Sequence, residues 1–205
     1  AVAPHNKYFG VMLPYTPLHY LLFSSQEMKF PALVMTSGNL ADEPIVTSNK
    51  EAVEKLSSLA DAFLLHDRDI FMRVDDSIVR SNRPAVTTRS DFRISDTDHE
   101  FRNFPPKIQV LRRSRGLVPE TLDIGEEMEE IFACGAELKN TFCLTKGSKA
   151  ILSQHTGDLE HYECLEFFKE TLENLKTLFR INPSVVAHDL HPDYVSTSFA
   201  LQYAG

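Results

Sequence analysis

Three short stretches of this sequence carry side chains suited to holding a phosphate ester. The first, Ser37-Gly38-Asn39, follows the apolar run 32–35. Glycine lets the backbone approach a ligand closely, and serine and asparagine side chains can donate hydrogen bonds to phosphate or carboxylate oxygens. The same residues also suit an ordinary polar turn after a strand. The stretch therefore predicts either a phosphate-handling turn or a plain loop.

The second stretch is Asp75-Asp76-Ser77, which lies between Arg73 and Arg80 at the entrance of an expected strand. Neighbouring side chains on a strand point to opposite faces, so only one of the two carboxylates can line a site. That carboxylate could hold Mg²⁺ beside a phosphate or orient an arginine. A solvated charge cluster is the alternative.

The third stretch, "LRRSRG", places Arg112, Arg113 and Arg115 at the end of an expected strand. On a strand, Arg113 and Arg115 share a face, and planar guanidinium groups suit phosphate oxygens. Surface basicity or contact with RNA is the alternative. Because the formal net charge is -8, a local site for a small phosphate compound fits better than a broad nucleic-acid groove.

Alternating strand and helix patterns must position these residues. We expect strands at 8–13, 32–37, 62–67 and 76–80 and a further strand with a basic end within 108–120, which indicates an α/β fold with ligands at strand ends. One helix is expected to begin with Thr16 as N-cap and Pro17 in the first turn, and another with Ser48 and Glu51 at capping-box spacing. Residues 81–107 lack periodicity and predict a long surface excursion.

A second pattern begins after the acidic stretch "LDIGEEMEE", where we place a domain boundary. Strands are expected at 130–136 and across 140–155, the latter folded into a hairpin at residues 146–148. A long amphipathic helix over 159–181, with Asp158 as its possible cap, carries an apolar stripe at three- and four-residue steps. The stripe consists of Leu165, Phe168, Leu172, Leu175 and Phe179. A strand at 184–190 and a helix at 192–203 complete the pattern.

Composition narrows the classes of function. The chain of 205 residues is 42% hydrophobic and 24% charged, as in globular proteins with a real core. Its pI near 5.5 argues against general binding of nucleic acid or an anionic membrane. No apolar run approaches the ~18 residues of a membrane span, and no signal peptide opens the chain, so we expect a cytoplasmic protein.

Cysteine and histidine spacing gives no metal site. The three cysteines form no C-x-x-C pair, which excludes a disulfide framework or zinc knuckle and fits a reducing compartment. Cys143 sits in an apolar strand as a small packed hydrophobe. His188 and His191 have no further ligand at metal spacing, and His19 and His66 are expected to be core or edge histidines.

The order of several strings resembles the HypF family of hydrogenase-maturation carbamoyltransferases. The most specific strings are "GAELKNTFCL" and "DLHPDYVST", and the likeness covers the chain except 81–107 and the acidic stretch. It implies a partial YrdC-like domain at 1–120, with a twisted mixed sheet, helices and an insertion at 81–107. The N-terminal part of a TsaD-like domain would follow at 126–205, as the first lobe of an actin-like ATPase (ribonuclease H-like) fold.

The resemblance also implies roles for particular residues. A catalytic set contacting the adenylate and its developing charge would comprise Ser37, Asn39, Asp76, Ser77 and Arg113. A nucleotide- and phosphate-binding set would comprise Tyr15, Thr16, Ser37, Gly38, Asn39, Arg73, Ser77, Arg112, Arg113 and Arg115. The residues lining the TsaD-like cleft would be Lys139, Asn140, His155, Asp158 and Asp189.

Cofactors and partners follow from the same resemblance. The family uses carbamoyl phosphate and ATP with Mg²⁺ to make carbamoyl-adenylate, and then passes the carbamoyl group to a cysteine of the acceptor protein HypE. Zinc belongs to the zinc-finger segments of the parent protein, and the metal of the TsaD-like domain is expected beyond Gly205. No membrane partner is expected, and the acidic balance argues against nucleic acid.

The sequence also departs from the family pattern. The lysine- and glycine-rich segment that opens the YrdC-like domain is missing. We therefore interpret the chain as a fragment, and a catalytically incomplete chain is one outcome that this interpretation allows. Two other functions remain open. One is a threonylcarbamoyl-adenylate synthase of tRNA modification, against which "ELKNTFCL" and "DLHPDY" weigh. The other is a non-catalytic piece that docks on HypE or RNA.

Overall fold

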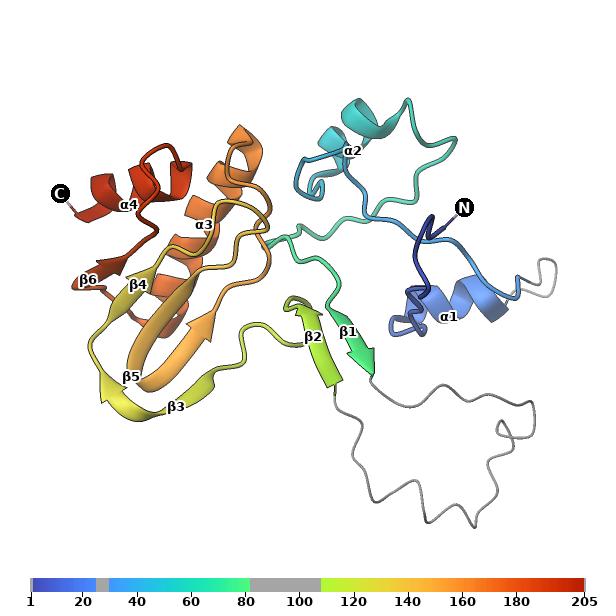
Figure 1. The fold of residues 1–205 in the computed structure, drawn as a ribbon. Helices are drawn as coiled ribbons and strands as arrows, with labels where there is room; N and C mark the ends of the chain where they lie inside the picture. The colour runs from blue at the N-terminus through green and yellow to red at the C-terminus, as the bar shows by residue number, and fades with distance from the viewer. Residues whose placement is uncertain (1, 25–29, 82–107, 205) are drawn as a thin grey trace, which may run out of the picture. The chain divides into compact units, whose positions relative to one another are not determined.

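A computed structural model describes residues 2–24, 30–81 and 108–204 of the chain. Most of the expected 81–107 excursion therefore lies outside the described residues. The chain divides into two compact units, Ala1–Ser37 and Gly38–Gly205, which are described separately here. The described residues form both helices and strands, which Figure 1 labels in chain order. No helix in the described ranges has the length and apolar character needed to cross a membrane.

The first unit contains helix α1 (Pro17–Ser24). Thr16 caps it as predicted, because its Oγ1 accepts a hydrogen bond from the backbone N–H of His19 at 3.3 Å. Proline suits the first helical position, where a missing N–H costs nothing. The predictions of strands at 8–13 and 32–37 were wrong, because neither run forms a strand. An apolar run becomes a strand only where a neighbour takes up its backbone hydrogen bonds.

The second unit opens with helix α2 (Asn49–Leu56). The predicted N-cap is confirmed: the Ser48 hydroxyl accepts from the N–H of Glu51 at 3.0 Å. The strand expected at 62–67 does not form. Strands β1 (Ile78–Ser81) and β2 (Ile108–Arg112) form where expected and pair antiparallel, with Ile78 opposite Arg112.

A four-stranded sheet with the order β3-β5-β4-β6 carries the rest of the second unit. Its strands are β3 (Leu122–Met128), β4 (Ile131–Ala133), β5 (Cys143–Leu152) and β6 (Val185–Ala187). β3 and β4 pair antiparallel with β5, and β6 runs parallel to β4. The acidic stretch at which we placed the domain boundary thus contains the exposed strand β3.

The hairpin expected at residues 146–148 was also wrong, because β5 continues through them as a single strand of 10 residues. Gly147 suggested a turn, and it does adopt a positive φ of 57°. It lies opposite Met128, next to the point where the register between β3 and β5 shifts. The extra residues of this shift lie on β3, between Asp123 and Met128, so the irregularity belongs to β3 while β5 runs through Gly147.

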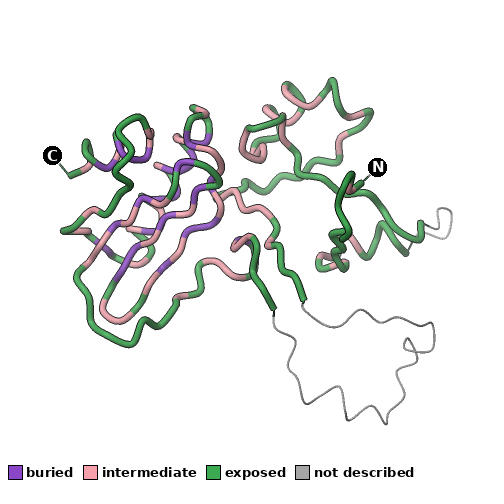
Figure 2. Tube along the Cα trace, in the orientation of Figure 1, coloured by how far each residue is buried: buried purple, intermediate pink, exposed green. Residues whose placement is uncertain are grey.

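Helices α3 (Tyr162–Phe179) and α4 (Val195–Ala204) cover this sheet. The predicted stripe on α3 is confirmed: Phe168, Leu172 and Leu175 are buried, and Leu165 and Phe179 pack at the margin. Figure 2 shows the buried residues gathered in this sheet and its helices. Asp158 does not cap α3, whose N-cap residue is His161.

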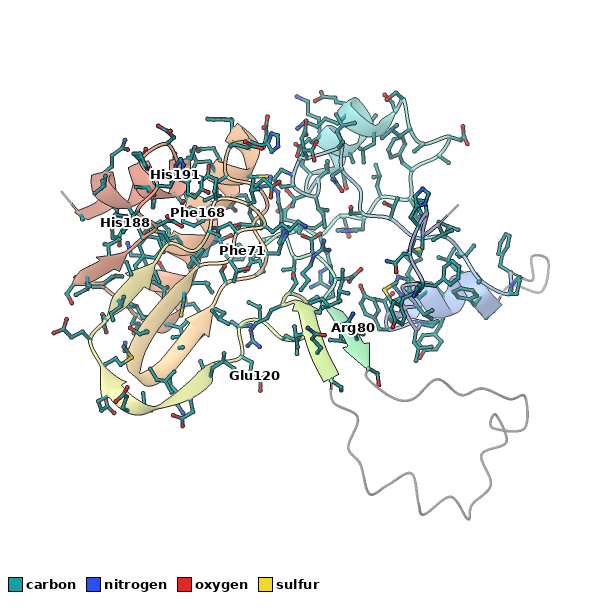
Figure 3. The ribbon with its side chains drawn as sticks, viewed as in Figure 1. Phe71, Arg80, Glu120, Phe168, His188 and His191 are labelled. Carbon is teal, nitrogen blue, oxygen red and sulfur yellow. The ribbon has the colours of Figure 1, made fainter. Side chains whose placement is uncertain are left out.

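Aromatic rings form the centre of that core. Phe168, labelled in Figure 3, lies 5.2 Å from the Phe142 ring, 5.3 Å from Phe199 and 6.1 Å from Phe132. These residues come from α3, the segment before β5, α4 and β4, so one cluster ties both helices to the sheet. Such edge-to-face pairs add to the stabilisation from burial.

Candidate functional site

Ser77 joins the β1 strand to the turn after β2. Its hydroxyl donates to the carbonyl of Arg115 at 2.9 Å and accepts from the N–H of Ser114 at 2.9 Å. The backbone N–H of Arg115 in turn donates to the carbonyl of Asp75 at 3.1 Å. Two of the three predicted stretches, 75–77 and 112–115, therefore meet, and the serine hydroxyl fixes their spacing.

Asp76 orients an arginine in this structure. Its Oδ1 lies 3.2 Å from Nε of Arg115, and both side chains are about half exposed. A second guanidinium nitrogen of Arg115 donates to the carbonyl of Val74 at 3.0 Å. Within the described ranges, no group of three or more acidic, histidine or cysteine side chains could hold a metal ion. Asp76 thus has the arginine-orienting arrangement, one of the two roles that the sequence left open for it.

Arg113 has the most suggestive environment for an anion. Its Nη2 donates to the carbonyl of Glu120 at 2.6 Å, which fixes the guanidinium after β2. Its Nε is buried and has no hydrogen-bond partner among the described residues. Burying an N–H without a partner is costly, so a nearby acceptor such as a phosphate oxygen would be stabilising. Arg112 is half-buried at the end of β2.

The Ser37-Gly38-Asn39 stretch straddles the boundary between the two units. The Asn39 amide donates to the carbonyls of Leu40 at 2.8 Å and Glu43 at 3.0 Å, and so closes the turn that follows. Its Oδ1 is buried without a partner among the described residues. The side-chain nitrogen of Asn39 is therefore used by the turn itself. The side-chain oxygen is the atom that has no hydrogen-bond partner among the described residues.

Tyr15 and Thr16 lie in the first unit, just before α1. The backbone N–H of Tyr15 donates to Nδ1 of His19 at 3.4 Å, and the two rings meet edge to face. The Thr16 side chain serves the helix cap. Both residues therefore make their contacts locally, at the start of α1.

Lys139 and Asn140 form a tight turn before β5. The backbone N–H of Lys139 donates to Oδ1 of Asp158 at 2.6 Å, and its φ of 51° is unusual for a lysine. The fully buried Asn140 amide donates to the carbonyls of Cys134 and Ala136, while its Oδ1 accepts from the Thr156 hydroxyl at 2.9 Å. Asn140 is therefore an anchor of the turn, and Lys139 is the exposed cation it presents.

Asp189 organises the loop between β6 and α4. Its Oδ1 accepts from the N–H of His191 at 3.0 Å, and its carbonyl accepts from the Thr197 hydroxyl at 3.1 Å. His191 stacks on Tyr194 with ring centroids 4.3 Å apart. Figure 3 labels His188 and His191 on this loop. The aspartate thus holds the entrance to α4 in a defined conformation.

Within the second unit, residues 73–75 contact helix α3 and the segment after β5. His155 Nδ1 lies 3.5 Å from Oδ2 of Asp75. Arg73 lies 3.6 Å from Glu170 and packs over the Phe167 ring at 5.6 Å. The Arg73 carbonyl also accepts from the buried Gln154 amide at 3.3 Å. Arg73 is therefore held by contacts on both its side chain and its backbone.

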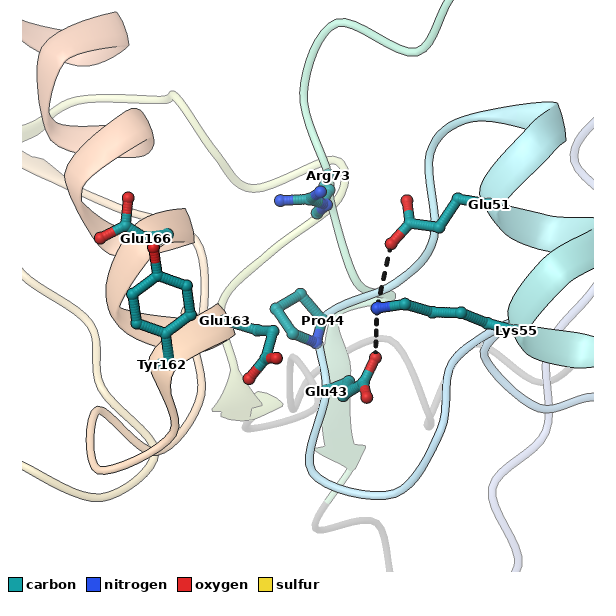
Figure 4. Close-up of a pocket in the computed structure, with 8 residues that line it drawn as sticks. All are labelled: Glu43, Pro44, Glu51, Lys55, Arg73, Tyr162, Glu163 and Glu166. Atoms are coloured by element: carbon teal, nitrogen blue, oxygen red, sulfur yellow. Dashed lines mark hydrogen bonds and ion pairs between the residues drawn. The ribbon is translucent and has the colours of Figure 1, made fainter.

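A cavity of about 150 Å³ opens beside Arg73 (Figure 4). The lining residues are Glu43, Pro44, Glu51, Lys55, Arg73, Tyr162, Glu163 and Glu166. Lys55 bridges Glu43 at 2.7 Å and Glu51 at 3.1 Å, and these bonds raise its pKa. Four carboxylates against two cations make this cavity unfavourable for a phosphate. Among the residues predicted to bind nucleotide or phosphate, Arg73 alone lines this cavity.

The cysteines are unsuited to nucleophilic chemistry. Burial raises the pKa of the Cys134 thiol to about 12, and burial also raises the pKa of Cys143 and of Cys164. A thiol reacts as its thiolate, so a raised pKa makes it inert near neutral pH. The description of Cys143 as a packed hydrophobe agrees with this environment.

Two buried polar residues were missed as candidates. Glu137 and Gln154 both lie within strings noticed in the sequence, yet neither was assigned a role. Glu137 accepts from the N–H groups of Val195 at 3.1 Å and Ser196 at 3.0 Å. Glu137 comes four residues after the end of β4, and the partners of its carboxylate lie 58 and 59 residues away, so no local pattern marks it.

Two family models match the chain in tandem. One, described as telomere recombination, matches residues 1–90, and the other, described as the HypF Kae1-like domain, matches residues 126–205. Carbamoyltransferase HypF2 of Cupriavidus necator is 41% identical over 215 residues, covering 99% of this chain and 24% of that protein. The probable carbamoyltransferase HypF of Methanocaldococcus jannaschii is 36% identical, covering 93% of this chain and 22% of its own length.

Solved structures give the same result. A full-length HypF, described as the phosphate- and nucleotide-bound form, matches with a TM-score of 0.77 and 43% identity, over 94% of this chain and 27% of that one. The HypF of T. kodakarensis matches with a TM-score of 0.77 and 37% identity, over 95% of this chain and 22% of that one. The chain spans about a quarter of the length of the curated relatives it matches.

Proposed function

The chain belongs to the HypF family of carbamoyltransferases, and from this premise we propose that it forms part of an enzyme that activates and transfers a carbamoyl group. Hydrolysis of carbamoyl phosphate would release phosphate and carbamate, and a carbamate oxygen would attack the α-phosphate of MgATP and expel pyrophosphate, which gives a carbamoyl-adenylate. The carbamoyl group would then pass to a cysteine of a HypE-type acceptor during maturation of a [NiFe]-hydrogenase. Residues 1–120 would contribute to the first step and residues 126–205 to the second.

The observation that carries the proposal is the buried, unpartnered Nε of Arg113 beside the joined stretches 75–77 and 112–115. Formation of the adenylate places negative charge on the attacked α-phosphate and on the departing pyrophosphate. A guanidinium already fixed by the Glu120 carbonyl can stabilise that charge without reorganising. Ser77 would keep β1 and the arginine turn at a constant spacing.

Magnesium would arrive with the nucleotide. The acidic groups near the arginine turn are engaged otherwise, since Asp76 contacts Arg115 and Asp75 contacts His155. We therefore propose that the phosphates of ATP carry the ion and that this part of the chain binds the phosphates through N–H donors. Lys139, on its turn before β5, would serve the transfer step as an exposed cation near an incoming nucleotide.

Isothermal titration of the 205-residue chain with MgATP, in the presence and absence of carbamoyl phosphate, tests the proposal. We expect saturable heat from the native chain and a roughly tenfold weaker affinity for Arg113→Ala, the size of one lost charge-assisted hydrogen bond. Ser37→Ala tests the turn in the same way. Arg80→Ala is a matched control, because Arg80 pairs with the Gln109 side chain on the neighbouring strand.

Absence of heat with every variant would overturn the proposal and favour a docking role. Heat that Arg113→Ala leaves unchanged would exclude this arginine as the phosphate ligand. Binding of HypE without nucleotide would also support docking. A tRNA-modification role would require threonine with bicarbonate to replace carbamoyl phosphate in the titration, and we expect no added heat from threonine and bicarbonate.

A further inference from the structure

Glu137 occupies an unusual position for a carboxylate. Its side chain is buried, at 7% exposure, between the turn before β5 and the start of α4. One carboxylate oxygen accepts from the N–H of Val195 at 3.1 Å and the other from the N–H of Ser196 at 3.0 Å. These are the first two residues of α4, whose N–H groups have no partner within the helix.

The same residue contacts a third stretch through its backbone. The carbonyl of Glu137 accepts from the N–H of Leu159 at 3.0 Å. Next to it, Asn140 exchanges backbone hydrogen bonds with Thr156 and Gly157, and Lys139 donates to Asp158. Glu137 is thus the point where the stretches 137–140, 156–159 and 189–197 converge.

Physical chemistry favours a charged side chain here. The N-terminus of a helix carries a partial positive charge, and N–H donors to a carboxylate form strong hydrogen bonds. Removing the side chain would leave two backbone N–H groups unpaired beside the Ser196 hydroxyl, which is itself buried without a partner among the described residues. The carboxylate also fills the place at α4 where an anionic ligand could otherwise bind.

We propose that Glu137 is a positioning residue for the transfer step: it locks the entrance of α4, with Asp189, against the turn that presents Lys139. This inference rests on the proposed function, in which Lys139 serves the transfer step, and on the family resemblance that assigns Asp189 to the same cleft. Glu137 acts through these two residues and does not contact the substrate. The distance between the lysine turn and the aspartate loop is then set by one carboxylate.

The test compares Glu137→Gln with Glu137→Ala in the full chain. Glutamine keeps the shape and one acceptor oxygen, but it turns an NH₂ group toward a backbone N–H, so the fold should persist while α4 moves. We expect MgATP affinity to fall on the order of tenfold for glutamine and further for alanine. Two controls are Glu126→Gln, on the exposed face of β3, and Ile151→Val, a mild destabilisation of the neighbouring β5.

If Glu137 merely stabilised the fold, Ile151→Val with an equal fall in melting temperature would lose as much affinity as Glu137→Gln, and the proposal would be overturned. Backbone amide NMR gives a readout independent of nucleotide. In Glu137→Gln we expect the signals of Lys139 and Asp189 to shift together with those of Val195 and Ser196. Shifts confined to Val195 and Ser196 would refute the positioning role. Native chain that binds no MgATP would refute the proposed function, while the NMR comparison would still decide on Glu137.

Discussion

The two stretches that match different family models hold their side chains in contrasting ways. Among the described residues of 2–81, none is buried, although the runs 8–13 and 32–35 are strongly apolar. In 126–204, a cluster built on Phe132, Phe142 and Phe168 is fully buried. Equal hydrophobicity along the chain therefore leads to different burial, because burial depends on which surfaces are available to pack together.

The contrast extends to the candidate polar residues. In the second region, the side chains of Asn140 and Glu137 are themselves buried and each makes several hydrogen bonds. In the first region, Asp76 instead pairs at an exposed surface with Arg115, which lies between the two regions. Water competes with exposed pairs and screens them, so the same residue types contribute less to stability there.

The largest expected difference between the regions comes from two phenylalanines. Phe168→Ala, at 0% exposure in the α3 core, should lower the free energy of unfolding by about 3–5 kcal/mol, since it leaves a cavity among three rings. Phe71→Ala, at 77% exposure, is the matched control and should change it by less than about 0.5 kcal/mol. Urea denaturation followed by circular dichroism measures both. Equal losses would show that Phe71 is buried in solution.

Two asparagines provide the next comparison. Asn140→Ala should cost about 2–3 kcal/mol, because the carbonyls of Cys134 and Ala136 lose their donor and the Thr156 hydroxyl loses the nearer of its two acceptors. Asn39→Ala also removes two bonds to carbonyls, but at a partly exposed turn, and should cost about 1 kcal/mol. Thermal unfolding of the two variants shows which substitution costs more stability. A costlier Asn39→Ala would mean that its turn is more deeply packed than the structure shows.

Cations at helix and strand ends give a smaller effect. Lys146 donates to the carbonyls of Phe179 at 2.9 Å and Arg180 at 2.6 Å, where it satisfies the C-terminus of α3. Lys146→Met keeps the length of the side chain and should cost about 1 kcal/mol. Chemical denaturation at low and high salt measures the loss. An unchanged stability at low salt would contradict a capping role for this lysine.

The smallest change is expected for Asp76→Asn. Its pair with Arg115 is half exposed, so the substitution should lower stability by no more than about 0.5 kcal/mol. Any effect should shrink as salt is raised, since exposed charges are screened. Differential scanning calorimetry at two salt concentrations tests this. A loss similar to that of Asn140→Ala would place Asp76 in a buried network.

Local signals in the sequence were sufficient to predict those elements that short-range interactions determine. The caps at Thr16 and Ser48, the apolar stripe of α3 and the strand β6 were all predicted, because capping and helical periodicity act over a few residues. Specific strings were also sufficient to indicate the family. The likeness of the chain to HypF relatives at 36–41% identity confirms that prediction.

Only the tertiary structure decided the pairing of strands and the partners of buried polar groups. The runs 8–13 and 32–37 look like strands, and Gly147 looks like a turn, yet their outcome depends on whether a neighbouring strand is present and on its register. Glu137 and the start of α4 are joined across 58 residues, a contact that no local pattern encodes. Hydrogen bonds between distant segments form only once the chain has packed, so their specificity resides in the fold as a whole.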